Sequence, residues 1–404
     1  MDRKGIGWSA FILTMLPTQA SGAGTFAQFD LNRVPSPCFV VDEIKLEENL
    51  KILQSIRSKT DAKILLALKA FSMWAVGPLI SKYLDGCCAS GLWEARLARK
   101  YFAKKDEGKI VSTFSPAYHP HDIEEITDLS DHIIFNSPSQ REKWGGDNLS
   151  ISQGLRINPL NPEGLVGKYD PCRPGSRLGW PIDQVTESMI KDFDGLHLHT
   201  LCEQDFPPLD RTWSKVSSVL GKYSDQFSWI NLGGGHHLTR TDYQVDELVE
   251  FLIQLRNETG AQILLEPGEA VALDAGILVG EVLDIMDTGV NHALLDLSAT
   301  CHAPDVIEAP YRPSLLGDKE KGKYCYRLGG VSCLAGDVFG DYQLNEPLRI
   351  GQRIAFLDQA HYSMVKTNTF NGVPLPSIAL WNSENDNLRI VKRFSFDDFE
   401  ERLS

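Results

Sequence analysis

The apolar and polar positions between residues 60 and 268 alternate between two kinds of segment. Short apolar, β-branched runs that end in turns predict strands, and stretches with an apolar residue every three or four positions predict helices that bury one face. The predicted strands are 63–69, 86–90, 109–113, 132–136, 154–158, 195–199, 229–232 and 262–266. The clearest predicted helices are 72–83, 92–103, 121–129 and 245–258. Eight such repeats predict a parallel (β/α)8 barrel, because a helical crossover usually connects parallel strands.

The pattern changes after residue 276. Strand-like stretches at 277–286, 292–297, 323–328 and 349–357 follow one another without predicted helices, and they indicate an antiparallel β-domain. A further strand, 35–42, precedes the first helix of the barrel series and is expected to join that sheet. We therefore predict an α/β protein with a disordered extension at 1–33, a strand of the β-domain at 34–45, a barrel at 46–275 and a mostly antiparallel β-domain at 276–404.

The first residues loosely imitate a signal peptide, since a short charged start precedes an apolar run at 6–16. Gly5, Gly7 and Ser9 dilute that run, and Asp2 weakens the basic region, so we expect an extension or a misplaced start codon instead. No other stretch approaches the roughly 18 apolar residues of a membrane span.

Composition and charge narrow the class of partner. A hydrophobic content of 42% and a charged content of 23% are typical of a folded globular chain. The net charge of −14 argues against a nucleic acid or an anionic membrane as partner and is compatible with a small cationic substrate. The eight cysteines form no CxxC pair, which indicates a reduced, cytoplasmic protein.

Unusual residues stand at the ends of the predicted strands, where barrels place their active sites. Lys69 ends an otherwise apolar strand, and a lysine amine in apolar surroundings has a lowered pKa and can attack aldehydes. An ordinary strand-end lysine is the alternative. His197 and His199 project from one face of the sixth strand. We expect ring stacking or a core role and no metal, because no carboxylate or cysteine in the pattern completes a zinc site.

Two further strand ends suggest a phosphate and a ring nitrogen as ligands. Gly233, Gly234 and Gly235 would let backbone N–H groups approach a phosphate, although a simple tight turn would need the same residues. Glu266 ends the eighth strand and needs a protonated partner if it is buried. An aldehyde-capturing lysine, a stacking histidine, a phosphate loop and a carboxylate together match the parts of pyridoxal 5'-phosphate.

The chain resembles the fold-type III pyridoxal-phosphate decarboxylases, the group of ornithine and diaminopimelate decarboxylases. Within that group it looks closest to the carboxynorspermidine/carboxyspermidine decarboxylases. The resemblance spans roughly residues 34–400 and implies an alanine-racemase-like barrel, decarboxylation in polyamine biosynthesis and a homodimer with shared active sites. The stretches that carry it are 35–40, 67–70, 197–203, 231–235, 266–270, 332–337, 361–364 and 369–372.

The resemblance also implies roles for single residues. Lys69 would hold the cofactor as a Schiff base, and His199 would stack on its ring. Glu266 would pair with the pyridine nitrogen, and Tyr362 would join Gly233, Gly234 and Gly235 at the phosphate. Cys333 would donate a proton to the decarboxylated carbon from the β-domain of a second subunit. A buried packing cysteine is the alternative at that position.

Departures from the family pattern concern the substrate. Glu269 replaces the arginine of an EPGR motif, and Leu334 replaces an acidic residue that follows the catalytic cysteine. Loss of the arginine disfavours a substrate with a distal carboxylate such as diaminopimelate, and the gain of Glu269 favours a substrate with spread positive charge. We therefore expect Glu269, Asp305 and Asp337 to contribute to amine binding, with an ordinary loop aspartate as the alternative for Asp305. His199-Thr200-Leu201-Cys202 replaces an HxGS stretch, which puts one phosphate contact in doubt.

Three alternatives stay open at this level. A decarboxylase for diaminopimelate or another basic amino acid would keep the same cofactor site. A racemase of the same fold would need a tyrosine base facing the lysine. A non-catalytic, partner-binding homologue would be expected to lose cofactor residues, whereas Lys69, His199, Glu266 and Cys333 all stand in this chain.

Overall fold

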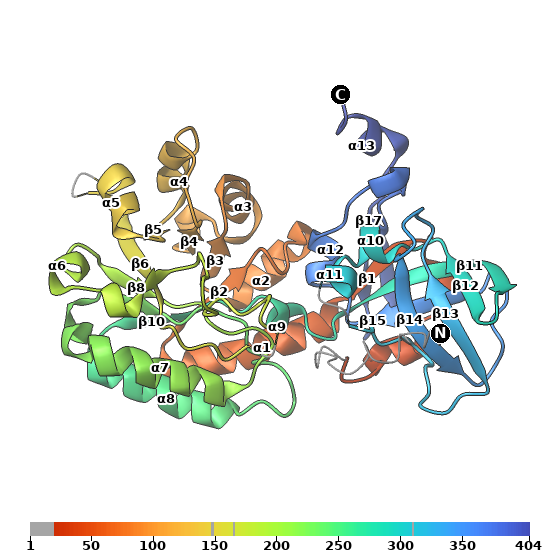
Figure 1. Cartoon of the computed structure of the whole chain (residues 1–404), viewed down its shortest axis with the longest axis horizontal. Helices are drawn as coiled ribbons and strands as arrows, with labels where there is room; N and C mark the ends of the chain where they lie inside the picture. The colour runs from red at the N-terminus through yellow and green to blue at the C-terminus, as the bar shows by residue number, and fades with distance from the viewer. Residues whose placement is uncertain (1–19, 147–148, 165, 309–310) are drawn as a thin grey trace, which may run out of the picture. The chain divides into compact units, whose positions relative to one another are not determined.

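The structure is a computed structural model that describes residues 20–146, 149–164, 166–308 and 311–404 (Figure 1). The chain divides into two compact units. The barrel unit comprises Asp42–Ala275 with Asn382–Asn385. The sheet unit comprises the residues up to Val41, Gly276–Trp381 and Asp386–Ser404.

The barrel unit is built on eight parallel strands that close on themselves. Strand β2 pairs with β3 and β10, the series continues through β4 and β5 on one side and β9 and β8 on the other, and β5 pairs with β6 to complete the ring. The predicted (β/α)8 barrel is therefore confirmed, with strand ends that differ from the prediction by at most two residues. The strands are β2 Lys63–Ala67, β3 Gly86–Ala89, β4 Ile110–Phe114, β5 His132–Phe135, β6 Ser152–Asn158, β8 Gly195–His197, β9 Trp229–Asn231 and β10 Gln262–Leu265. A short strand, β7 (Trp180–Pro181), pairs with the end of β6.

Helices cover the outside of this barrel, and Figure 1 shows α1, α7 and α8 along one side of it. They are α1 Glu43–Thr60, α2 Gly77–Tyr83, α3 Leu92–Leu97, α4 Ile123–Leu129, α5 Pro138–Trp144, α6 Glu187–Ile190, α7 Phe206–Leu220, α8 Val245–Thr259 and α9 Glu269–Ala272. Helix α1 begins where the Asp42 carboxylate accepts a hydrogen bond from the Ile44 amide, and it buries Leu46, Leu50 and Leu53 on one face.

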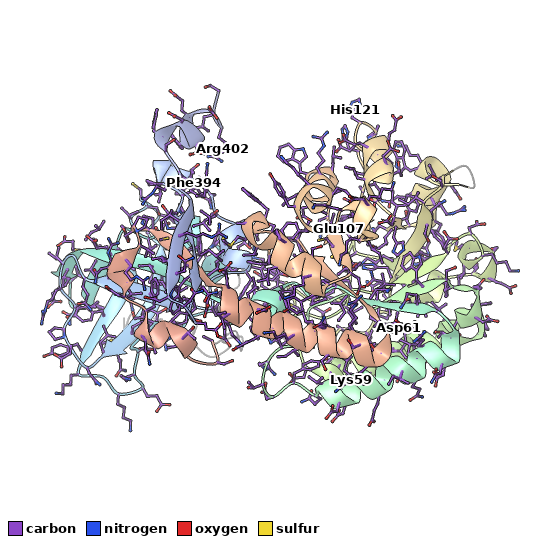
Figure 2. All side chains as sticks on the ribbon, turned by 180° about the vertical axis from the view of Figure 1, so that it is seen from behind. Lys59, Asp61, Glu107, His121, Phe394 and Arg402 are labelled. Atoms are coloured by element: carbon purple, nitrogen blue, oxygen red, sulfur yellow. The ribbon has the colours of Figure 1, made fainter. Side chains whose placement is uncertain are left out.

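Two predicted helices are less regular than their apolar spacing suggested. The segment 72–83 is a 3-10 turn, Trp74–Val76, followed by α2, because Pro78 at the first turn of α2 starts a new helix. The segment 92–103 is α3 followed by a π-helical turn at Ala98–Phe102. Helix α1 ends at Thr60, where Asp61 takes a left-handed conformation with φ 56°, and Figure 2 labels Lys59 and Asp61 at this end.

The sheet unit is mostly antiparallel, as predicted, but not entirely. Strand β11 pairs antiparallel with β1, β12 and β15, and β13 pairs antiparallel with β14, whereas β12 and β13 are parallel. The reason is the connection between them, which contains two helices where none was predicted, since parallel neighbours need a crossover. The elements are β1 Cys38–Asp42, β11 Gly276–Asp287, β12 Asn291–Leu295, α10 Ala299–His302, α11 Asp305–Glu308, β13 Tyr324–Gly329, β14 Val338–Leu344, β15 Arg353–Leu357, α12 Tyr362–Val365, β16 Ser377–Asn382, β17 Asn387–Lys392 and α13 Phe396–Glu400.

The segment before β1 is ordered in its described part, which corrects the prediction of a disordered extension for residues 24–33. Two 3-10 turns, Gly24–Gln28 and Leu31–Arg33, carry Phe26 and Phe29 onto the Trp381 ring, with centroid distances of 5.5 and 4.8 Å. Burying two phenylalanines stabilises this segment by several kcal/mol, on the order of 2 kcal/mol each. The signal-like stretch at 1–19 lies outside the described residues. Among the described helices, none is long and apolar enough to cross a membrane.

Candidate active site

Lys69 lies in the turn directly after β2 and not in the strand itself. The Ala67 amide donates to the Pro267 carbonyl at 2.9 Å, and the Leu68 amide donates to the Cys88 carbonyl at 3.2 Å, so the turn is fixed to both neighbouring strand ends. From this turn the Lys69 amine reaches the His199 ring, with Nζ 3.0 Å from Nε2. The backbone thus delivers the lysine to the carboxyl end of the barrel strands, where the sequence predicted a site.

The surroundings of Lys69 make its amine a better nucleophile. The side chain is solvent-exposed, yet the protein atoms around the amine still desolvate it and lower its pKa. The Arg156 guanidinium lowers the pKa further, while the Glu266 carboxylate opposes both effects. An amine that is accessible and more often neutral than a free lysine is suited to attack an aldehyde.

Glu266 lies at the centre of a buried polar cluster. Its carboxylate is 3.5 Å from His197 Nε2 and 3.6 Å from His199 Nδ1, and Asn231 Nδ2 donates to it at 2.7 Å. The sequence analysis selected His199 and Glu266 but gave no role to Asn231, although Asn231 belongs to the Asn231-Leu232-Gly233 stretch. Its position at the end of β9, two residues before the glycines, could have indicated from the sequence that Asn231 belongs to the site.

Electrostatics keeps this carboxylate charged. Burial alone would raise the pKa of Glu266, but His197 and His199 outweigh burial and hold it well below its usual range. Burial, reinforced by the charge of Lys69, lowers the pKa of His199 to about 3, so this ring is a neutral imidazole at pH 7. A flat, neutral ring and a carboxylate are the groups that would face an aromatic cofactor with a protonated nitrogen.

Phe114 and Arg156 support the two histidines, and the sequence analysis missed both. The Phe114 ring stacks on His197 with centroids 5.5 Å apart. The Arg156 guanidinium carbon lies over the Phe114 ring, 4.4 Å from its centroid. Arg156 also donates to the His199 carbonyl at 2.8 Å. No sequence spacing links these residues, because they come from different strands and meet only in the closed barrel.

The structure corrects the argument against a metal. That argument held that no carboxylate completes the His197 and His199 pair, yet Glu266 does so: ligand atoms of the three residues lie within 4.8 Å of one another. The third member directly follows β10, which pairs with β9 on the side away from β8, and the sequence pattern did not reveal this neighbourhood. The geometry of these three residues is therefore compatible with a bound cation.

The glycine loop after β9 is required by close packing. A Cβ atom on Gly234 would stand 2.0 Å from the Glu266 carbonyl oxygen, and one on Gly235 would stand 2.0 Å from the Leu201 carbonyl oxygen. Gly233 and Gly235 also have positive φ of 72° and 87°. The Gly233 amide donates to Asn231 Oδ1 at 2.9 Å, and the Gly234 amide faces His199 Nδ1 at 3.3 Å. The loop fits a phosphate cradle, but packing against neighbouring strands would demand the glycines in any case.

Glu269 begins α9 beside the Lys69 turn. Gly268 packs so closely that its Cβ would stand 2.6 Å from the Ala70 Cβ and 3.1 Å from the Ala67 Cβ. The Glu269 carboxylate is mostly buried, and its Oε1 lies 3.4 Å from His237 Nε2. The replacement of arginine by Glu269 thus introduces a negative charge directly after the glycine that packs on the Lys69 turn, together with an internal histidine partner.

Cys333 lies on an exposed loop of the sheet unit. Its amide donates to Asn371 Oδ1 at 2.9 Å, which ties the loop to the 369–372 stretch. Asp337 was predicted to bind a substrate amine, but it is buried and accepts hydrogen bonds from the Thr300 and Ser332 amides. These bonds stabilise the Cys333 loop and argue against an amine-binding role for Asp337, because its carboxylate already accepts from backbone amides.

Asp305 is also occupied by the protein itself. Its carboxylate accepts a hydrogen bond from Lys366 Nζ, which reaches Glu308 as well. A carboxylate that is already paired with an internal ammonium attracts a substrate amine weakly, so the structure argues against Asp305 as an amine site. Tyr362 begins α12 in the same unit, and its predicted contact with the phosphate stays a prediction.

Comparisons with known proteins identify the family of this chain. A family model described as pyridoxal-dependent decarboxylase, C-terminal sheet domain, matches residues 38–360. The carboxynorspermidine/carboxyspermidine decarboxylase of Campylobacter jejuni is 38% identical over 386 residues, which are 92% of this chain and 99% of that relative. The chain belongs to the pyridoxal-dependent decarboxylases. It is therefore a carboxy-lyase with pyridoxal 5'-phosphate as its cofactor.

Other members of this decarboxylase family are similarly close. The carboxyaminopropylagmatine decarboxylase of Synechocystis sp. is 38% identical over 379 residues, covering 92% of this chain and 96% of that relative. The crystal structure of carboxynorspermidine decarboxylase from Campylobacter jejuni, complexed with norspermidine, superposes with a TM-score of 0.83 at 36% identity over 91% of this chain and 100% of that chain. The fold class predicted from the sequence is thus confirmed in solved members of the family.

Proposed function

We propose that this decarboxylase acts on carboxynorspermidine, carboxyspermidine or both, and releases norspermidine or spermidine. The observation that carries the proposal is Glu269, a carboxylate beside the Lys69 turn at the position where relatives with other substrates have arginine. A negative charge there favours a substrate with several ammonium groups. Relatives with this activity share 38% and 36% identity with the chain.

Residues of the barrel would hold and tune the cofactor. Lys69 would bind its aldehyde covalently, His199 would lie against the ring, and Glu266 would keep the ring nitrogen protonated. Gly234 and Gly235 would contribute amides to the phosphate. When bound, the cofactor supplies an electron sink for the bond to the departing carboxylate. The buried, hydrogen-bonded state of Glu266 supports this assignment, because an ionised carboxylate there needs a cationic partner.

Cys333 would then act as the proton donor to the substrate α-carbon. We further propose that it does so in the site of a second, identical subunit. Apolar side chains around it support an interface: Val331 is 47% exposed, Leu334 43% and Phe370 48%. Large apolar groups that cluster on a projecting loop are typical of a surface that another chain covers.

Mixed dimers test the shared site directly. Lys69→Ala and Cys333→Ala variants are each expected to be inactive alone. If each site takes Lys69 from one chain and Cys333 from the other, mixing the two variants and allowing subunits to exchange restores part of the wild-type activity. Lack of recovery, with subunit exchange shown by a size or affinity tag, would place both residues in the same chain's site.

A second substrate has equal support from the comparisons. The carboxyaminopropylagmatine decarboxylase of Synechocystis sp. is as similar to this chain as the Campylobacter jejuni protein. An agmatine-derived substrate carries a guanidinium in place of a terminal amine, and Glu269 could pair with either cation. We therefore include this compound among the substrates to be compared.

The deciding experiment measures carbon dioxide release by the purified, cofactor-loaded protein. Carboxynorspermidine, carboxyspermidine, carboxyaminopropylagmatine, diaminopimelate, ornithine and arginine are offered separately at several concentrations. The proposal predicts turnover of one or both carboxylated triamines with the highest kcat/KM. Preference for the agmatine derivative selects the second candidate, and preference for diaminopimelate or ornithine overturns the argument from Glu269.

The role of Glu269 has its own test. Glu269→Gln removes the charge but keeps the size of the side chain, and we expect KM for the preferred substrate to rise about tenfold with a smaller change in kcat. Glu258→Gln is a matched control, since Glu258 lies at the exposed end of α8 and contacts Gln254. An unchanged KM in Glu269→Gln would remove this residue from the amine site.

We also propose a cytoplasmic location, which the cysteines support. All eight are free, including the exposed Cys325 and Cys333. A proton-donating thiol at Cys333 requires a reducing compartment. Fractionation of the native host with an antibody against the protein would test this, and recovery outside the cytoplasm would contradict it.

A further inference from the structure

The two histidines after the glycine loop belong to a polar network that the proposed mechanism does not use. Both are buried, at 2% exposure for His236 and 3% for His237. They point to different partners: His236 Nδ1 lies 2.7 Å from the Tyr243 hydroxyl, whereas His237 Nε2 lies 3.4 Å from Glu269 Oε1. Of these two histidines, only His237 therefore connects the loop to the Glu269 carboxylate.

Arg240 decides which nitrogen of His237 carries the proton. Its NH1 group lies 3.0 Å from His237 Nδ1, and a guanidinium can only donate. In the neutral ring, Nδ1 must accept this bond and the proton must sit on Nε2, the atom that faces Glu269. In the doubly protonated ring, Nε2 carries a proton as well. In either state His237 presents an N–H to the Glu269 carboxylate.

The charges around His237 favour this orientation. Arg240 is itself held by Asp205 and Asp242, and the His237 amide donates to the Gln204 carbonyl at 3.1 Å. Burial alone would lower the pKa of His237, but Glu269 and, more weakly, Glu203 outweigh it and raise the pKa, against the opposing charge of Arg240. Glu203, on the segment after β8, and Glu269, on α9, thus both raise the pKa of this ring.

We propose that His237 is a positioning residue for substrate specificity: it holds the Glu269 carboxylate ionised and oriented toward the substrate's ammonium groups. This inference rests on the proposed function, because it requires Glu269 to bind the substrate. A mostly buried carboxylate without such a partner would tend to take up a proton and lose its attraction for a cation. Arg240 contributes by fixing the ring, and Asp205 and Asp242 by fixing Arg240.

The test compares His237→Ala and His237→Gln in the cofactor-loaded, full-length protein. His237→Ala is expected to raise KM for the preferred substrate about tenfold while kcat changes less, which is the signature of lost ground-state binding. The amide of His237→Gln can still donate to Glu269, so this variant is expected to recover most of the lost affinity. Tyr243→Phe is the control, because it removes a hydroxyl that contacts His236 and leaves the His237 and Glu269 pair in place.

A double-mutant comparison separates this inference from the proposed function. If His237 acts through Glu269, then His237→Ala has little further effect on KM once Glu269→Gln is present. Equal additive effects, or a KM unchanged in His237→Ala while it rises in Glu269→Gln, would overturn the role of His237 and leave the proposed function intact. Failure of the wild-type protein to turn over any polyamine-like acid would instead overturn the proposed function.

A folding defect would be recognised independently of KM. The visible absorbance of the bound cofactor and the thermal unfolding midpoint are measured for each variant. If His237→Ala loses the cofactor, the comparison uses His237→Gln against His237→Leu, which has similar volume and no donor. Equal KM values for these two variants would then overturn the proposal.

Discussion

Glu266 illustrates what single residues gain from the closed barrel. Its carboxylate meets two imidazoles from the end of β8 and one amide from the end of β9, in a region from which water is largely excluded. In such surroundings a full charge interacts much more strongly than it does in water. The residue is thus prepared to stabilise a positive charge that arrives with a ligand, without rearrangement at that moment.

Removing this charge should slow catalysis without removing the side chain. In Glu266→Gln the carbonyl oxygen of the new amide can still accept from Asn231, so the local packing is kept. We expect kcat to fall by about a hundredfold or more, because in the proposed arrangement the ring nitrogen of the cofactor would lose its anionic partner. Steady-state kinetics with the cofactor content measured by absorbance would check this, and a kcat near wild type at full occupancy would assign the charge a structural role.

The metal alternative at the same residues makes an opposite prediction. If His197, His199 and Glu266 serve the organic cofactor, dialysis against a chelator leaves kcat unchanged, and metal analysis finds less than one equivalent of any transition metal per site. Loss of activity on chelation, with recovery on adding zinc, would identify a metal centre instead.

At the scale of elements, the sequence pattern located every strand of the barrel. Apolar runs of four to seven residues between helical stretches are a strong signal, because buried parallel strands need no polar face. Strand ends were less certain: Lys69 and His199 lie beyond the last paired residues of β2 and β8. The sheet unit was harder, since β14 (Val338–Leu344) contains glycine, aspartate and glutamine at partly exposed positions and was not predicted.

Long-range contacts explain what the sequence could not provide about the site. The meeting of Lys69, His199, Glu266 and the glycine loop was expected from their places at strand ends. By contrast, the pairing of Asp305 with Lys366 and the burial of Asp337 depend on turns and short helices with no periodic signal. These internal partners argue against the amine-binding roles that were assigned from carboxylate identity alone.

The glycine loop offers a prediction about an element. Gly234→Ala places a methyl group 2.0 Å from the Glu266 carbonyl oxygen, without the complication of positive φ. The loop must move, at a cost of about 1–3 kcal/mol, and we expect cofactor affinity to fall by roughly the matching factor of ten to a hundred. Gly221→Ala is the control, because its Cβ would meet only the Ser217 Cβ at 3.9 Å. Titration of the apoprotein with pyridoxal phosphate measures both.

At the scale of the whole molecule, buried histidines should make stability depend on pH. Burial lowers the pKa of His236 in the barrel unit to about 3 and that of His302 in the sheet unit to about 4. The unfolded chain takes up these protons near pH 6.5, whereas the folded chain does not. Stability is therefore fully present above pH 6.5 and falls as the pH is lowered toward 4, by about 1.4 kcal/mol per pH unit for each histidine.

Urea unfolding between pH 7.5 and 5 at constant ionic strength checks this expectation. Replacing His236 by phenylalanine, which keeps an aromatic ring against Tyr243, should make the dependence of the unfolding free energy on pH shallower. His121→Gln is the control, since this side chain is exposed in the folded protein (Figure 2). A pH dependence that is identical in all three proteins would show that other groups dominate.

The pairing of β2 with β10, the first and last strands of the barrel, affects when the site can form during synthesis of the chain. The Lys69 turn is completed by contacts from Pro267 and Gly268, which leave the ribosome long after the lysine itself. A nascent chain that has emerged only as far as β9 contains the Lys69 amine but lacks the residues after β10 that pack against the Lys69 turn. Stable binding of pyridoxal 5'-phosphate is then expected only after β10 has been synthesised. A chain that holds the cofactor has therefore already closed its barrel.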